Sequence, residues 1–490
     1  MTRMSSLLII NQGLAPPIPC IKMDGNCKIY ILQLHLYKKL KGVLSVLDTV
    51  KRRMSYARVI ALGFLLIIFG GAVLLWLPIS SKSGGFTGFS DAFFTSVSAT
   101  CVTGLAVRDT AGYWSIFGKC VILVLIQTGG IGFMSLFTLT AMLMGKTIHL
   151  RQRKLLMQSA GGLQLGGIVA LLKKIIIGTL IFEGSGAVLL CFRFCPQMGF
   201  WKGLCSAVFH SVSAFCNAGF DIMPGEYTSM TAYVHDPLVN LVLMGLILVG
   251  GLGFAVWSDI KKCGLRFSRY RLHTKIVLVS TAVLSAGGTA LFYIAEKDGL
   301  LAGMSFWEAL LAAAFGAVSP RTAGFSALDL SRLSGAGVLT VVMLMFIGGN
   351  PGSTAGGIKT TTLWVLIMTA AASARRSKNV EIFKRRISED TARRASAVIT
   401  LYLSAVIFAS FVICVAEGLG FGEVLFETVS AAATVGLSMG ITAKLGLLSK
   451  IILMVLMYGG RVGGLTLGMV LAEKKVNVPL ESPKEEILIG

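Results

Sequence analysis

Long and half-length apolar runs alternate along this chain in an order that returns four times. The first repeat has a long run over 59–77, a half-length run over 92–99 and a second long run over 116–144. A helix needs roughly 20 apolar residues to cross a bilayer. The long runs therefore predict spanning helices, and the half-length run predicts a helix that enters the membrane and turns back.

The other three repeats keep the same order. In repeat two the long runs cover 175–191 and 238–257, with a half-length run over 204–215. In repeat three they cover 276–295 and 338–372, with 309–317 between them. In repeat four they cover 397–415 and 451–471, with 424–433 between them. We expect an all-α polytopic membrane protein with eight transmembrane helices and four half-membrane pore helices in a pseudo-fourfold arrangement around one pore. The expected segments are an N-terminal cytoplasmic or disordered extension (1–56), repeat 1 (57–145), repeat 2 with its preceding cytoplasmic link (146–258), repeat 3 with a broken second helix (259–372), and repeat 4 with the C-terminal tail (373–490).

Composition agrees with a membrane protein. Of the 490 residues, 54% are hydrophobic and 14% are charged, whereas a soluble domain carries about 25% charged residues. The mean hydropathy is +0.78. The ten cysteines are scattered, and they show no CxxC or Cys/His spacing that predicts a metal site or a disulfide framework.

Lysine and arginine are concentrated on one side of the predicted membrane. The links 146–174, 261–275 and 371–394 hold 6, 6 and 8 of them, and 38–58 holds 7. The segments with the half-length runs hold only 2, 2, 3 and 2. The positive-inside rule places the links and the N-terminus in the cytoplasm and the half-length helices on the outer side. The net charge of +22 thus indicates topology rather than nucleic-acid binding. The basic cluster over 375–394 is either a flank near lipid headgroups or a docking face for a cytoplasmic partner.

Each half-length run leads into a short segment that contains glycine. The four glycines are Gly104, Gly219, Gly324 and Gly436, at intervals of 115, 105 and 112 residues. One such glycine alone would indicate an ordinary helix end. Four in register indicate a fourfold internal repeat.

These segments have the chemistry of a cation pathway. A helix C-terminus carries roughly half a negative charge, so four half-helices that end at one axis favour a cation. Glycine permits backbone carbonyls to line a pore, and rings of carbonyls replace the hydration shell of potassium. Few acidic residues lie near; Asp109 and Asp221 are the nearest. The candidate filter residues are Val102, Thr103, Gly104, Asn217, Ala218, Gly219, Thr322, Ala323, Gly324, Thr434, Val435 and Gly436.

Several segments carry a resemblance to a known family. They are Ser98-Ala99-Thr100-Cys101-Val102-Thr103-Gly104-Leu105, Gln127-Thr128-Gly129-Gly130-Ile131-Gly132-Phe133, Phe215-Cys216-Asn217-Ala218-Gly219-Phe220 and Ser319-Pro320-Arg321-Thr322-Ala323-Gly324-Phe325. With the fourfold pattern over 57–490, they resemble the Trk/Ktr/HKT superfamily of potassium transporters. Because we expect no extra pair of N-terminal spanning helices, the chain is most similar to the Ktr-type potassium uptake membrane subunit (KtrB-like). The ending over 483–490 also resembles that subunit.

The resemblance implies a homodimer in the bacterial plasma membrane with one pore per subunit and a cytoplasmic nucleotide-binding regulatory ring (KtrA-like). Nucleotide is expected only on that partner subunit, and no cofactor in this chain. The family's filter glycines match Gly104, Gly219, Gly324 and Gly436, which implies potassium selectivity; sodium dependence stays open. Because the filter segments differ in sequence, we expect looser coordination than in tetrameric potassium channels.

A glycine-rich segment interrupts the second long run of repeat three. It reads Gly348, Gly349, Asn350, Pro351, Gly352, Ser353, Thr354, Ala355, Gly356 and Gly357. Interior glycine costs a helix about 1 kcal/mol and proline about 3 kcal/mol, so the segment is a kink or an irregular loop that lines a cavity. By resemblance it is the intramembrane gating loop.

Three charged residues fall in or beside apolar spans. Arg461 is deep in its run, where a charge is by default functional; the alternative is snorkelling to an interface. By resemblance it lies at the pore, where loop groups such as Asn350, Ser353 and Thr354 would hold it. Lys359 belongs either to this region or to the cytoplasmic end of the helix. For Glu183 we expect a hydrogen bond in helix packing.

The pattern favours potassium uptake driven by the membrane potential. The alternative is a proton- or sodium-coupled secondary transporter of another small solute, since broken helices and buried charges also occur there. That class favours inverted repeats, whereas these four run parallel. We find no Walker, GxSxG, HExxH or Rossmann motif and do not expect an enzyme.

Overall fold

The structure is a computed structural model, and it describes residues 56–132, 168–223, 230–264, 266–377, 379–383 and 385–463. All of them belong to the second of two units, Met1–Ser55 and Tyr56–Gly490. Several predictions lie outside the described residues: nearly all of the N-terminal extension, most of the link 146–174, the far ends of the runs 116–144 and 451–471, and the ending 483–490.

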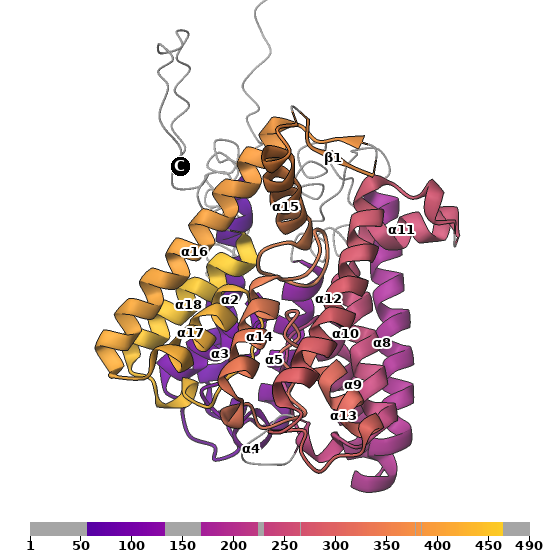
Figure 1. Ribbon diagram of the computed structural model, residues 1–490. Coiled ribbons are helices and arrows are strands. Elements are labelled where there is room, and N and C mark those ends of the chain that lie inside the picture. The colour runs from indigo at the N-terminus through magenta and orange to yellow at the C-terminus, as the bar shows by residue number, and fades with distance from the viewer. Residues whose placement is uncertain are drawn as a thin grey trace, which may run out of the picture. The chain divides into compact units, whose positions relative to one another are not determined.

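The described residues are almost entirely helical (Figure 1). Each repeat begins with a long helix: α2 (Tyr56–Trp76), α8 (Ile168–Met198), α12 (Leu272–Glu296) and α16 (Glu389–Glu417). A pore helix follows: α3 (Phe89–Cys101), α9 (Phe200–Phe215), α13 (Phe306–Val318) and α17 (Phe421–Ala432). The second helices are α5 (Ile116–Ile131), α10 (Pro237–Leu252) with α11 (Phe254–Cys263), α14 (Gly335–Phe346) with α15 (Thr360–Ala374), and α18 (Leu447–Val462).

Short elements complete the described chain. They are α4 (Thr110–Tyr113), the 3₁₀ turns η1 (Pro78–Ser80), η2 (Thr231–Tyr233), η3 (Phe267–Arg269), η4 (Leu330–Arg332) and η5 (Thr442–Lys444), and the strands β1 (Glu381–Ile382) and β2 (Arg385–Arg386). The strands pair antiparallel, with Glu381 opposite Arg386. This hairpin lies in the expected link between repeats three and four.

The four first helices are long and apolar enough to cross a membrane. The second helices differ from the sequence expectation, because the run 238–257 is not one straight helix. Helices α10 and α11 meet at an angle of 93°. The bend falls at Gly253, whose φ of 95° suits glycine. Gly132 and Gly463 end α5 and α18 with similar φ values of 87° and 95°.

The helices pack in a cyclic order. Within each repeat the first helix contacts its pore helix and its second helix. Between repeats, the second helix contacts the pore helix of the next repeat: α5 with α9, α10 with α13, α14 with α17, and α18 with α3. The cycle closes on itself, so the four pore helices lie inside a ring of helices.

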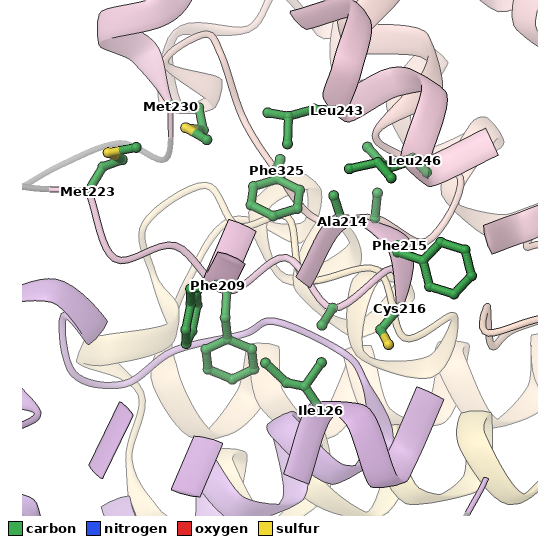
Figure 2. Close-up of a cluster of buried hydrophobic side chains, with 14 of the residues drawn as sticks. Ile126, Phe209, Ala214, Phe215, Cys216, Met223, Met230, Leu243, Leu246 and Phe325 are labelled. Carbon is green, nitrogen blue, oxygen red and sulfur yellow. The ribbon is translucent and has the colours of Figure 1, made fainter. Parts of the chain in front are cut away.

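The largest buried cluster joins repeats one, two and three. Figure 2 shows Ile126 of α5 near Phe209 and Cys216, with Leu243 and Phe325 close by. These side chains are less than 5% exposed. Their burial fixes the end of pore helix α9 relative to its neighbours, and this end leads directly into the candidate filter.

Candidate functional site

The four expected filter glycines lie side by side in a closed ring. A Cβ atom added at any of them would come closer than 3.0 Å to a backbone carbonyl oxygen of the next repeat, a separation that real Cβ atoms essentially never show. The pairs are Gly104 with Ala218, Gly219 with Ala323, Gly324 with Val435, and Gly436 with Thr103. Each glycine therefore gives room to a neighbouring carbonyl, and any side chain here would disturb the ring.

The residue two positions before each glycine has a left-handed backbone. The φ values are 58° at Val102, 59° at Asn217, 71° at Thr322 and 52° at Thr434. This conformation costs an L-residue roughly 1–2 kcal/mol, and it is an outlier for the three β-branched residues. Such strain persists where the surroundings enforce it, and it clusters at functional sites.

Hydrogen bonds to the pore helices enforce these turns. The residue before each glycine donates its N–H to a serine carbonyl in or just after the pore helix, over 2.7–2.9 Å. The bonds run from Thr103 to Ser98, Ala218 to Ser213, Ala323 to Ser319, and Val435 to Ser430. The N–H groups thus point back to the helices, and the carbonyl oxygens of the same residues lie at the ring.

The carboxylates that are nearest in sequence to the four glycines, Asp221 and Asp109, accept hydrogen bonds from groups close to them in the chain. Asp221 accepts hydrogen bonds from the backbone N–H groups of Met223 (2.6 Å) and Met230 (3.0 Å), and it lies 2.7 Å from Nε2 of His210. Asp109 caps the N-terminus of α4. The ring is therefore built of backbone carbonyls and the negative ends of four helices.

The glycine-rich segment Gly348–Gly357 is an irregular loop between α14 and α15, as expected for a broken helix (Figure 1). A bridge between Ile347 and Ile358 closes its base. Asn350 donates its amide to the carbonyl of Gly251 (2.8 Å), and Thr354 donates its hydroxyl to the carbonyl of Phe215 (3.1 Å). The loop is therefore fastened to the second repeat.

Arg461 reaches this loop from the end of α18. Its guanidinium donates hydrogen bonds to the carbonyls of Thr354, Gly129 and Gly130, the last over 3.1 Å. Of the three loop residues expected to hold it, Thr354 does so, through its backbone carbonyl rather than its hydroxyl. Asn350 and Thr354 instead hold the second repeat, and Ser353 bonds the carbonyl of Asn350 (2.7 Å).

Lys359 and Glu183 also acquire partners. The ammonium of Lys359 donates to the carbonyls of Ala355 (2.7 Å) and Gly356 (3.3 Å), so it folds over the loop. Glu183 accepts a hydrogen bond from the amide of Gln127 (3.0 Å), which is the helix-packing contact expected for it.

Sequence reasoning missed a second glycine pattern. Glycine pairs occur near the end of three second helices, at 129–130, 250–251 and 459–460, and in the loop just after α14, at 348–349. A Cβ atom at Gly129, Gly250 or Gly460 would collide with a carbonyl oxygen near the end of a pore helix, namely that of Thr100, Phe215 or Ala432. The repeated Gly-Gly doublet was the available signal, and it marks where second helices pass closest to pore helices.

Comparison with known proteins agrees with this architecture. Residues 36–478 match the TrkH family, described as a cation transport protein. The chain is 41% identical over 416 residues to the Ktr system potassium uptake protein B of Bacillus subtilis, covering 84% of this chain and 92% of that protein. It is 38% identical over 448 residues to the potassium/sodium uptake protein NtpJ of Enterococcus hirae, covering 90% and 98%.

A solved structure shares the fold. The potassium transporter TrkH from Vibrio parahaemolyticus superimposes with a TM-score of 0.68 at 19% identity, over 86% of each chain. The expectation of an all-α polytopic membrane protein is thereby confirmed. The chain belongs to the TrkH family of cation transport proteins.

Proposed function

We propose that this chain is the ion-translocating subunit of a Ktr-like potassium uptake system, driven by the membrane potential. The observation that carries the proposal is the closed ring of Gly104, Gly219, Gly324 and Gly436 with the carbonyls beside it. Two relatives with at least 38% identity are named for potassium uptake, which supports this ion as the substrate.

Selectivity would come from the carbonyl ring. The oxygens of Thr103, Ala218, Ala323 and Val435 replace part of the hydration shell of potassium, and the ends of the pore helices add negative potential. The twelve candidate filter residues identified from the sequence form these four turns. Sodium would be a second cation that enters by this route. The name of one relative, a potassium/sodium uptake protein, supports this.

The loop Gly348–Gly357 would act as the gate. Arg461 fastens Thr354 to the glycine pair of α5, and its charge opposes a passing cation. Lys359 adds a second positive charge on the carbonyls of Ala355 and Gly356. Opening then requires these contacts to break and the loop to move aside.

The assembly would be a homodimer in the bacterial plasma membrane, with the pore helices outside and the basic links inside. Two relatives are named proteins of a Ktr system, which supports a KtrA-like cytoplasmic ring as partner. Nucleotide would bind to that ring, while this chain carries the cation as substrate and needs no cofactor. The basic links supply a surface that suits lipid headgroups and a cytoplasmic partner.

The competing function is a coupled secondary transporter of another small solute. The bent pair α10–α11 and the broken pair α14–α15 resemble the discontinuous helices of that class. The test is uptake by a potassium-uptake-deficient bacterium that expresses the chain with a matching cytoplasmic subunit. Growth at low potassium supports our proposal. Absence of rescue, with the protein shown to be in the membrane, supports the competitor.

A further inference from the structure

A buried arginine stands directly beside the filter of repeat three. Arg321 lies three residues before Gly324 and is 6% exposed. Its guanidinium reaches only neutral oxygens, those of Ser285 (3.2 Å) and Thr281 (3.4 Å) on α12, and its Nε is buried with no hydrogen-bond partner. None of the ion pairs found among the described residues joins it to a carboxylate.

Repeat two has a buried carboxyl group beside the position that matches Arg321. Cys216 lies three residues before Gly219, as Arg321 does before Gly324. The thiol of Cys216 is 3.8 Å from Oε1 of Glu183 on α8. Glu183 is 6% exposed, and within the described chain its side chain pairs with the Gln127 amide rather than with a cation.

Glu183 and Ser285 occupy equivalent positions on the first helices of their repeats. Each lies three residues before a glycine, Gly186 or Gly288. An added Cβ at either glycine would meet a leucine of the second helix and a small residue of the pore helix: Leu246 and Ser211 for Gly186, Leu344 and Ala317 for Gly288. Repeats two and three thus place a carboxylate and a guanidinium behind the same part of the filter.

The two filter segments are neighbours in the ring. The side-chain amide of Asn217 lies 3.4 Å from the hydroxyl oxygen of Thr322, and Gly219 packs against Ala323. At the position three residues before the glycine, repeats one and four carry Cys101 and Ala433. The fourfold backbone therefore carries an asymmetric set of buried ionisable groups. Glu183 and Arg321 lie behind adjacent filter segments, while the buried Glu427 of repeat four accepts hydrogen bonds from Ser438 and Thr442.

We propose that Glu183 and Arg321 are specificity-determining residues, an opposed pair of buried charges that sets the affinity of the filter for its cation. This rests on the proposed function of the glycine ring. Glu183 strengthens cation binding and Arg321 weakens it. A transport filter needs this balance, because an ion must bind well enough to enter and weakly enough to leave.

Charge neutralisation tests the proposal. The variants are Glu183→Gln, Arg321→Gln and the double variant, and the readouts are KM and Vmax for potassium uptake by cells that also express the cytoplasmic subunit. A charge acts on a nearby ion more strongly in the low dielectric of the protein interior than in water, so removing it changes the affinity for that ion. We expect KM to rise several-fold in Glu183→Gln, to fall several-fold in Arg321→Gln, and to return to within about twofold of the parent in the double variant.

A merely structural role gives a different pattern. Both single variants would then lose membrane-inserted protein or Vmax, and the double variant would be worse than either. That pattern, or an unchanged KM in both single variants, overturns the proposal. Lys297→Gln and Asp298→Asn, which neutralise two exposed charges just after α12, are matched controls that should leave KM unchanged.

A parallel Gly104→Ser variant separates this inference from the filter assignment. If Gly104→Ser changes ion selectivity while the charge variants leave KM unchanged, only the charge pair is wrong. If Gly104→Ser leaves selectivity unchanged, the filter assignment itself is wrong.

Discussion

The guanidinium of Arg461 donates a hydrogen bond to the carbonyl oxygen of Gly130 over 3.1 Å, so the end of α18 is tied to the end of α5. The same guanidinium bonds the carbonyl of Thr354. One side chain therefore joins repeats one, three and four. Since its partners are all backbone carbonyls, the contact is independent of their side chains.

Neutralising this arginine should open the pathway. In Arg461→Gln the charge and most of the donors disappear, so we expect uptake without the cytoplasmic subunit to rise roughly 5-fold or more. Radioactive rubidium uptake, normalised to the protein in the membrane, measures it. Arg461→Lys keeps the charge and should stay closer to the parent. Equal uptake by the parent and Arg461→Gln would contradict the role of Arg461 as a barrier.

The hydroxyl of Thr354 should help to keep the loop closed. Thr354→Val keeps the shape of the side chain but removes the 3.1 Å hydrogen bond to the carbonyl of Phe215. A net hydrogen bond contributes about 1 kcal/mol, so basal uptake should rise by up to about fivefold. Thr340→Val is the matched control, because that hydroxyl bonds only the carbonyl of Ala336 in its own helix. An equal effect of both substitutions would show that the loop contact is unimportant.

The close approach at Gly250 should make this position intolerant of a side chain. In Gly250→Ala the new Cβ would collide with the carbonyl of Phe215, whereas Gly245 in the same helix has nothing within 4 Å of such an atom. Overpacking costs about 1–3 kcal/mol, so the melting temperature of purified protein should fall for Gly250→Ala only. Equal melting temperatures for Gly250→Ala and Gly245→Ala would show that the helices adapt without cost.

The sequence predicted the repeats because burial in lipid requires long apolar runs, which are visible without a structure. It also predicted that the four repeats share a glycine at one register, since glycine is needed where carbonyls of adjacent repeats crowd together. The 93° bend at Gly253 was missed because the apolar run continues past this glycine, from Leu252 to Phe254 and on to Trp257.

Long-range contacts were beyond sequence reasoning. The partners of Arg461 are backbone carbonyls, which carry no residue-type signal, and they lie more than 100 residues away. Likewise, the pairing of Glu183 with Gln127 depends on how repeats one and two pack, and the position of Arg321 against α12 depends on how the helices of repeat three pack. Only the fold reveals that Glu183 lies beside Cys216, the residue of repeat two that corresponds to Arg321.

The most direct test of the central claim is the ratio of potassium to sodium uptake for the parent, Gly104→Ser and the matched control Gly70→Ser. Gly70 has nothing within 4 Å of an added Cβ, whereas Gly104 crowds the carbonyl of Ala218. We predict preference for potassium in the parent and in Gly70→Ser, and weaker potassium uptake with increased sodium entry in Gly104→Ser. A Gly104→Ser variant that keeps the parent's ratio and rate would contradict the assignment of this ring as the selectivity filter.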